Sequence, residues 1–194
     1  MADINQIKKL REETGISIGE CKKALEEAKG DEKLAKDKLR EWGAKIADKR
    51  ASREALEGIV VSYIHPNNKV GVLLDMRCES DFVAKSDDFK DLSHEICLQI
   101  AAMDPSYIKE EDVPKEEIEK KREIFLKQLE EDKKPKEIKE KIVEGKIKKD
   151  LQESVLLYQP WVKEEKKTIE KLLEEYTAKI GEKIKIERFT RYQI

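Results

Sequence analysis

The chain has 194 residues, of which 43% are charged and 38% hydrophobic, and its formal net charge is -2. This length allows one ordinary domain or two small ones and excludes a large multidomain assembly. No apolar run approaches the roughly 18 residues that a membrane-spanning helix needs. Met1 leads directly into a charged helical pattern without the features of a secretory signal. We therefore expect a soluble, cytoplasmic protein.

The near balance of 41 basic and 43 acidic residues argues against nucleic-acid binding through the whole surface and favours a protein partner. The cysteines Cys21, Cys78 and Cys97 are too far apart to give local metal-ligand spacing with His65 and His94. We expect reduced, buried thiols, structural histidines and no metal site. The sequence has neither a phosphate-binding loop nor a local catalytic motif, so we expect no cofactor and no covalent catalysis.

Residues 1–46 predict three short amphipathic helices. Ser17 and Glu20 have capping-box spacing, and Gly30 followed by Asp31 marks the end of the second helix and the start of the third. The apolar positions predict three buried faces: Ile4, Ile7, Leu10 and Thr14; Ile18, Cys21, Ala24, Leu25 and Ala28; Leu34, Ala35, Leu39, Trp42 and Ile46. The expected organisation is a three-helix module over residues 1–46 and a basic linker over residues 47–56.

Residues 57–194 predict an α+β core. Alternating apolar residues on both sides of residues 66–68 indicate a β-hairpin, and the alternation at the C-terminus slips phase between Ile186 and Phe189, as a bulge would cause. Apolar residues at helical spacing predict a helix from Phe89 to Met103. Two further helices are expected to begin at Pro114 and Pro135, and a fourth to end at Gly181. We expect a three-stranded antiparallel sheet with helices on one face. The Glu- and Lys-rich residues 115–149 favour a solvated helix pair over a coiled coil, because no apolar heptad persists.

One segment, residues 78–85, places an aromatic residue directly after an acidic one in a short connection. Ser80 or Asp81 can cap a helical turn. Judged by residue type alone, Phe82 is more often folded back onto a core than held out toward a partner. Both positions of Phe82 stay open at this point.

Five stretches of the chain carry a resemblance in their order and spacing: residues 7–15, 21–26, 80–84, 135–145 and 159–162. They resemble the bacterial translation elongation factor Ts family in its short form, which lacks the duplicated core of longer members. The resemblance implies a ubiquitin-associated-like N-terminal module, an α+β core and guanine nucleotide exchange on elongation factor Tu. It also implies that Asp81 and Phe82 enter the partner's nucleotide domain and disturb its Mg²⁺ site.

The residues that the resemblance assigns to partner binding are Ser80, Asp81, Phe82 and Val83 in the core, and Arg11, Ile18, Gly19 and Lys22 in the N-terminal module. The sequence departs from the family pattern at several positions. Ile18 and Gly19 stand where many relatives have two methionines, and Ser80 replaces the usual Thr. Gln99 stands where His is common and Trp161 where Phe is common. Losing the methionine pair reduces the flexible apolar surface of the module.

Two further hypotheses follow. A three-stranded sheet leaves open edges, and longer relatives carry two cores, so we expect a homodimer with Ile184, Ile186, Phe189 and Tyr192 as candidate interface or core residues. The alternative function is a ribosome- or RNA-associated module that contacts phosphates through the basic residues Lys45, Lys49, Arg50 and Arg53. RNA binding would be far more sensitive to salt than an apolar protein interface.

Overall fold

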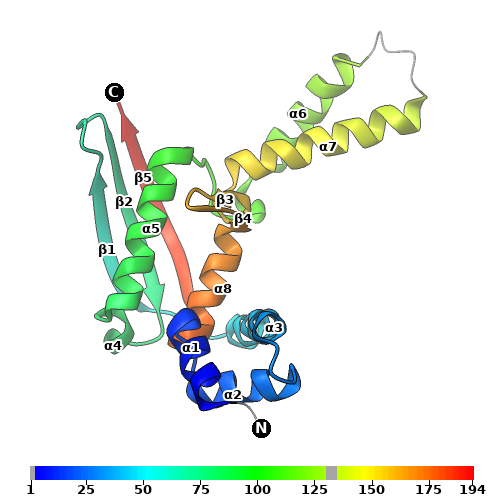
Figure 1. The fold of residues 1–194 in the computed structure, drawn as a ribbon. Helices are drawn as coiled ribbons and strands as arrows, with labels where there is room; N and C mark the ends of the chain where they lie inside the picture. Colours follow the sequence, from blue (N-terminus) through cyan, green and yellow to red (C-terminus); the bar gives the residue numbers. More distant parts are fainter. Residues whose placement is uncertain (1–2, 130–134) are drawn as a thin grey trace.

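The computed structural model describes residues 3–129 and 135–194, and it begins with three helices (Figure 1). These are α1 (Ile4–Thr14), α2 (Ile18–Glu27) and α3 (Glu32–Arg50). The Glu20 N–H donates to Ser17 Oγ at 3.3 Å, and that hydroxyl donates to the Glu20 carboxylate at 3.0 Å. Gly15 and Gly30 have left-handed backbones, with φ of 69° and 87°. The predicted punctuation of the module is confirmed.

The three helices enclose a small core of their own. Its buried residues are Ile7, Leu10, Cys21, Ala24, Leu25, Ala28, Ala35 and Leu39. Three predicted members are wrong, because Ile4, Ile18 and Leu34 are 68%, 54% and 46% exposed. Each lies in the first turn of its helix, at the edge of the shared core. Helical periodicity places a side chain on a face but does not show how far along the helix that face is covered.

The helix α3 extends further than the sequence pattern predicted. Residues 47–50 of the expected linker are helical, so residues 51–56 alone connect the module to the first strand. The apolar pattern stops earlier, but Lys49 and Arg50 in the last turn interact favourably with the helix dipole. A polar sequence at the end of a helix can therefore be predicted as a linker although it is helical in the structure.

The core contains the expected three-stranded antiparallel sheet, in the order β1 (Glu57–Ile64), β2 (Val70–Cys78) and β5 (Ile184–Gln193). Asp75 of β2 lies opposite Arg188 of β5. The next residue, Met76, lies opposite Ile186, which leaves Glu187 as an extra residue in β5. The predicted bulge is confirmed, and it keeps Ile186 and Phe189 on the same face of the sheet.

Helices α5 (Asp87–Met103) and α8 (Ile169–Ile180) pack on one face of this sheet (Figure 1). The main core lies between these layers and includes the buried residues Val72, Leu74, Met76, Phe89, Leu92, Ile96, Ile100, Ile169, Leu172, Ile184 and Ile186. The one-turn helix α4 (Asp81–Ala84) closes one end of the core. The predicted α+β architecture, with helices on one face, is confirmed.

Helices α6 (Lys115–Lys127) and α7 (Lys136–Ser154) form a helical hairpin that projects from the core (Figure 1). Pro114 and Pro135 occupy the N-cap positions, so both helices begin where the sequence predicted. The hairpin base has a third cluster, with Val113, Val143, Ile147, Leu151 and Val155 buried. Residues 130–134 of the expected helix pair lie outside the described residues. Among the described helices, none is both long and apolar enough to cross a membrane.

A buried pair of glutamines joins the helical hairpin to the core. The Gln99 amide donates to Gln159 Oε1 at 3.1 Å, and Gln99 Oε1 accepts the Val162 N–H at 3.0 Å. Gln159 also donates to the backbone oxygen of Glu153 at 2.6 Å. Both glutamines are fully buried, so these bonds offset the cost of removing their amides from water. The short strands β3 (Pro160–Trp161) and β4 (Glu164–Thr168), which the sequence did not predict, follow this point.

We propose that the N-terminal module folds on its own, because its core and helix caps are complete within residues 1–50. A fragment of residues 1–50 should be helical and unfold at a lower temperature than the whole chain, since a core of this size is marginal. Circular dichroism at low temperature measures this directly. A fragment that remains a coil even in the cold would contradict the domain boundary.

Candidate partner-binding surface

The connection between β2 and α5 contains a tightly built turn. Ser80 is the N-cap of α4, and its hydroxyl oxygen accepts the Val83 N–H at 3.3 Å. Val83 and Ala84 are 7% and 4% exposed and belong to the main core. Val83, which the resemblance assigned to partner binding, therefore anchors the turn from inside. We call residues Ser80–Ala84 the exchange turn, after the nucleotide exchange that the resemblance implies.

Phe82 lies on the outside of the exchange turn, where it is 81% exposed. Of the two positions that residue type left open for Phe82, the structure has the outward one, although packing on the core is the commoner position for a phenylalanine. Successive residues of a helical turn point about 100° apart, and Val83 takes the inward position. An aromatic side chain left in water forgoes roughly 1.5–3 kcal/mol of burial energy. The fold thus holds a rigid apolar group out from a braced backbone.

Asp81 is exposed beside Phe82 and has one side-chain partner in the turn. The Lys85 ammonium donates to Asp81 Oδ2 at 2.7 Å, and the two side chains are 75% and 67% exposed. This hydrogen bond and the charge of Lys85 lower the pKa of the Asp81 carboxyl. An exposed pair of this kind contributes little to stability. Asp81 is therefore charged at neutral pH and can exchange Lys85 for groups of another molecule at low cost.

The exchange turn is braced from behind by a residue that the sequence analysis missed. Glu182 accepts the Ser80 hydroxyl at 2.7 Å and the Ser80 N–H at 3.0 Å. Glu182 follows α8, 102 residues further along the chain. Ser80 therefore has two functions, as the cap of α4 and as the donor of two hydrogen bonds to one carboxylate.

The four candidate residues of the N-terminal module are all exposed. Arg11 lies in the last turn of α1, and Ile18, Gly19 and Lys22 lie at the start of α2. A Cβ added to Gly19 would meet nothing within 4 Å, so the surface there is open. The module and the exchange turn lie at the same end of the molecule, the lower end in Figure 1. The structure thus places both predicted contact regions toward one end.

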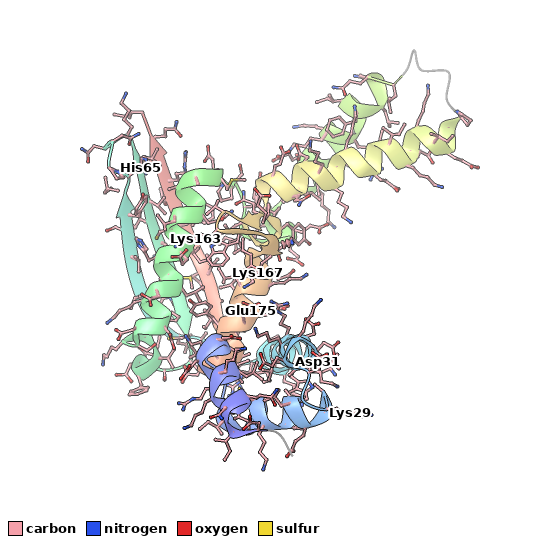
Figure 2. All side chains as sticks on the ribbon, in the orientation of Figure 1. Lys29, Asp31, His65, Lys163, Lys167 and Glu175 are labelled. Atoms are coloured by element: carbon pink, nitrogen blue, oxygen red, sulfur yellow. The ribbon has the colours of Figure 1, made fainter. Side chains whose placement is uncertain are left out.

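The N-terminal module docks on the core through α3 and α8. A Cβ added to Gly43 of α3 would come within 3.1 Å of the Ala178 Cβ, so the two helices approach closely there. Arg40 Nε lies 3.8 Å from Glu175 Oε1, and Glu175 also accepts from Lys167 of β4 at 2.7 Å (Figure 2). These contacts give the module a defined position on the core.

Comparison with known proteins identifies the family of this chain. Residues 5–194 match the family described as "Elongation factor TS". The chain belongs to the elongation factor Ts family. It is 50% identical to elongation factor Ts of Thermotoga maritima over 188 residues, which cover 97% of this chain and 94% of the relative. It is 46% identical to elongation factor Ts of Thermosipho melanesiensis over 194 residues, covering 100% and 99% of the two chains. The family is one of translation elongation factors, and the resemblance seen in the sequence is confirmed.

In this member of the elongation factor Ts family, two of the four basic residues of the alternative RNA-binding hypothesis form ion pairs within the chain. Lys45 and Lys49 are exposed. Arg50 and Arg53 both donate to Glu79, at 3.0 and 2.9 Å. One carboxylate therefore binds two of the four cations that were expected to contact phosphates. This arrangement favours a structural role for the two arginines.

Among the cysteines and histidines of this elongation factor Ts family member, Cys78 contacts the exchange turn, because its thiol donates to the Ser80 backbone oxygen at 3.2 Å. All three cysteines are free and buried, as predicted, and burial raises the pKa of the Cys97 thiol to about 12. His65 Nδ1 lies 3.0 Å from the Tyr63 hydroxyl near the β1–β2 turn (Figure 2). Within residues 3–129 and 135–194, no group of three or more His, Cys, Asp or Glu side chains is arranged to hold a metal ion.

Proposed function

We propose that this protein is a guanine nucleotide exchange factor that promotes GDP release from elongation factor Tu during translation elongation. The observation that carries the proposal is Phe82, a large apolar side chain held 81% exposed on a turn that Val83 and Glu182 fix to the core. Membership of the elongation factor Ts family supports the choice of partner. This role requires no covalent chemistry and places the protein in the cytoplasm with its partner.

The proposed mechanism is differential binding. A protein that binds the nucleotide-free state of a GTPase more tightly than the nucleotide-bound state must lower nucleotide affinity by the same factor. A change of about 10⁴ in nucleotide affinity requires about 5.5 kcal/mol of differential binding. Phe82 acts as a wedge that shifts packed elements of the partner between discrete positions. Asp81 brings a negative charge toward the groups that hold Mg²⁺ and phosphate, where a dry interface strengthens its field.

The N-terminal module supplies a second contact in this proposal. Arg11, Ile18, Gly19 and Lys22 form an exposed surface with two cations and one apolar side chain. Ile18 at 54% exposure offers the larger part of its side chain to a partner. Two contacts on one rigid chain give more affinity than either contact alone.

We also propose that the protein is a homodimer. The sheet face opposite α5 exposes Val60, Ile64, Leu73 and Tyr192, with exposures between 52% and 74%. Beside these apolar residues lies a charged band in which Asp75 contacts Arg77 at 2.6 Å and Arg188 at 3.4 Å. Asp75 is 5% exposed and paired within its own chain, so the apolar patch is the part of this face left for a partner. A two-fold interface brings the same patch of two subunits together, so a second copy can cover this patch with its own.

The candidate interface residues of the sequence analysis divide between core and surface. Ile184 and Ile186 are each 8% exposed and belong to the core, and Phe189 packs against it. Tyr192 is 74% exposed on the open face. The alternation of β5, interrupted by its bulge, explains this division. The proposed interface is therefore the open face of the sheet, to which Tyr192 contributes.

The proposed exchange function is tested by measuring release of a fluorescent GDP analogue from elongation factor Tu in the presence of excess GDP. Addition of this protein at micromolar concentration should accelerate release by at least about 100-fold, since the differential binding needed for that is about 2.7 kcal/mol. An unchanged release rate, with both proteins folded, would show that the proposed function is wrong.

A further inference from the structure

Three connecting segments meet directly behind the exchange turn. They are the end of α3 with residues 51–53, the connection Glu79–Ser80, and the connection between α8 and β5. Lys183, from the third segment, donates its backbone N–H to Glu79 at 2.6 Å. Its ammonium donates to the backbone oxygens of Ala51 and Arg53 at 2.6 and 2.8 Å. These hydrogen bonds form a junction between the N-terminal module, the exchange turn and the C-terminal strand.

Glu79 is the residue that contacts both of the other segments. Its carboxylate accepts from Arg50 at 3.0 Å, from Arg53 at 2.9 Å and from the Lys183 N–H at 2.6 Å. Its side chain is 19% exposed. Burial disfavours the charged form of Glu79, but the three hydrogen bonds outweigh it and hold the pKa of the carboxyl below its ordinary value. A charged acceptor with three donors is a strong and directional link.

We infer that Glu79 is a positioning residue, whose carboxylate fixes the last turn of α3 to the exchange turn so that the N-terminal contact surface and Phe82 meet the partner in one geometry. This inference rests on the proposed exchange function. Glu79 directly precedes Ser80, so a displacement of its carboxylate moves the backbone that carries Phe82. A fixed relation between two contacts reduces the entropy lost on binding.

Two other contacts near this site do not connect α3 with the exchange turn. The close approach of Gly43 and Ala178 holds α3 against α8, but it does not involve the exchange turn. Glu182 accepts hydrogen bonds from Ser80, whereas Arg50 and Arg53 donate to Glu79. Glu79 and Glu182 therefore differ in a way that can be measured: Glu79 contacts both of the other segments, whereas Glu182 contacts Ser80 of one other segment.

Hydrogen exchange of backbone amides in the isolated protein tests the link. Glu79→Gln should accelerate exchange about 10-fold in residues 46–53 and also in residues 80–86, because a charge-assisted hydrogen-bond network is lost. Glu182→Gln should accelerate exchange in residues 80–86 alone. Residues 92–100 of α5 report global unfolding and should be unchanged in both variants. A Glu79→Gln variant with acceleration confined to residues 46–53 would overturn the inference.

Glu117→Gln is the matched control for this experiment. Glu117 also accepts two hydrogen bonds, from the Tyr107 hydroxyl at 2.5 Å and from Lys121 at 2.9 Å, but it lies on α6. Its replacement should leave exchange in residues 46–53 and 80–86 as in the unmodified protein. Acceleration there by Glu117→Gln would mean that any lost carboxylate loosens these segments, and the specific role of Glu79 would be wrong.

A double-mutant cycle gives the functional measurement. Glu79→Gln should slow release of GDP from elongation factor Tu several-fold when Phe82 is present and have no further effect in a Phe82→Ala background. Glu79→Gln should lower the melting temperature equally in both backgrounds. A purely structural role predicts the same decrease, so the release rates and not the melting temperatures distinguish the two roles. Additive slowing of release would overturn the positioning role. If the unmodified protein does not accelerate release at all, the proposed function fails, and the hydrogen-exchange pattern alone decides whether Glu79 joins the two segments.

Discussion

Replacing Phe82 with alanine is expected to slow GDP release from elongation factor Tu, relative to the unmodified protein, by roughly 30- to 150-fold. This corresponds to the loss of about 2–3 kcal/mol that a central aromatic residue contributes at a protein interface. The melting temperature should be nearly unchanged, because Phe82 is 81% exposed and a surface substitution changes stability by only about 0.5 kcal/mol. Stopped-flow fluorescence and thermal denaturation measure the two quantities. Asp81→Ala should act in the same direction but more weakly.

Phe89→Ala provides the matched control, since it removes the same side chain from a fully buried position in α5. It should destabilise the protein by about 3–5 kcal/mol through the cavity it leaves. Exchange per folded molecule should remain close to that of the unmodified protein. The wedge assignment is wrong if Phe82→Ala destabilises the protein as Phe89→Ala does while exchange per folded molecule is unaffected.

Local signals made much of the fold predictable. Ser17 and Glu20 lie in the same turn, so their spacing alone predicted the cap that the structure contains. The phase slip after Ile186 predicted the bulge at Glu187 for the same reason, because strand alternation is a local property. In contrast, β3 has two residues and β4 carries the sequence Glu-Glu-Lys-Lys-Thr, without alternating apolar positions. Such strands depend on tertiary hydrogen bonds, including the one from Val162 to Gln99.

The candidate site was predictable only in part. The resemblance indicated the exchange turn, whereas residue type alone left open whether Phe82 faced the core, because Val83 beside it is equally suited to the inward position. The residues behind the turn had no sequence signal. Glu79 meets the Lys183 N–H across 104 positions of the chain, and Glu182 meets Ser80 across 102. Contacts of this kind arise from topology, since β2 and β5 are neighbours in the sheet.

The second large effect is expected at the open face of the sheet, where Leu73→Glu should convert the proposed dimer into a monomer. Leu73 lies on the central strand β2 and is 52% exposed. In a two-fold interface each substitution occurs twice, so two unpaired carboxylates would be buried against apolar groups. A buried, unpaired charge costs about 3–5 kcal/mol. The dimer dissociation constant should therefore rise by well over about 100-fold, while the folded chain itself should remain intact because Leu73 is exposed in the monomer.

Light scattering after size-exclusion chromatography at micromolar concentration measures this change in mass, and Leu126→Glu is its control. Leu126 lies on α6 in the projecting hairpin and is 40% exposed, so it offers a similar apolar side chain away from the sheet. Leu126→Glu should keep the dimer mass, and both variants should keep the melting transition of a folded chain. A monomer mass for the unmodified protein at micromolar concentration would refute the dimer. A dimer mass for Leu73→Glu would show that the two copies associate through another surface, because the open face cannot accept two buried carboxylates without a large loss of affinity.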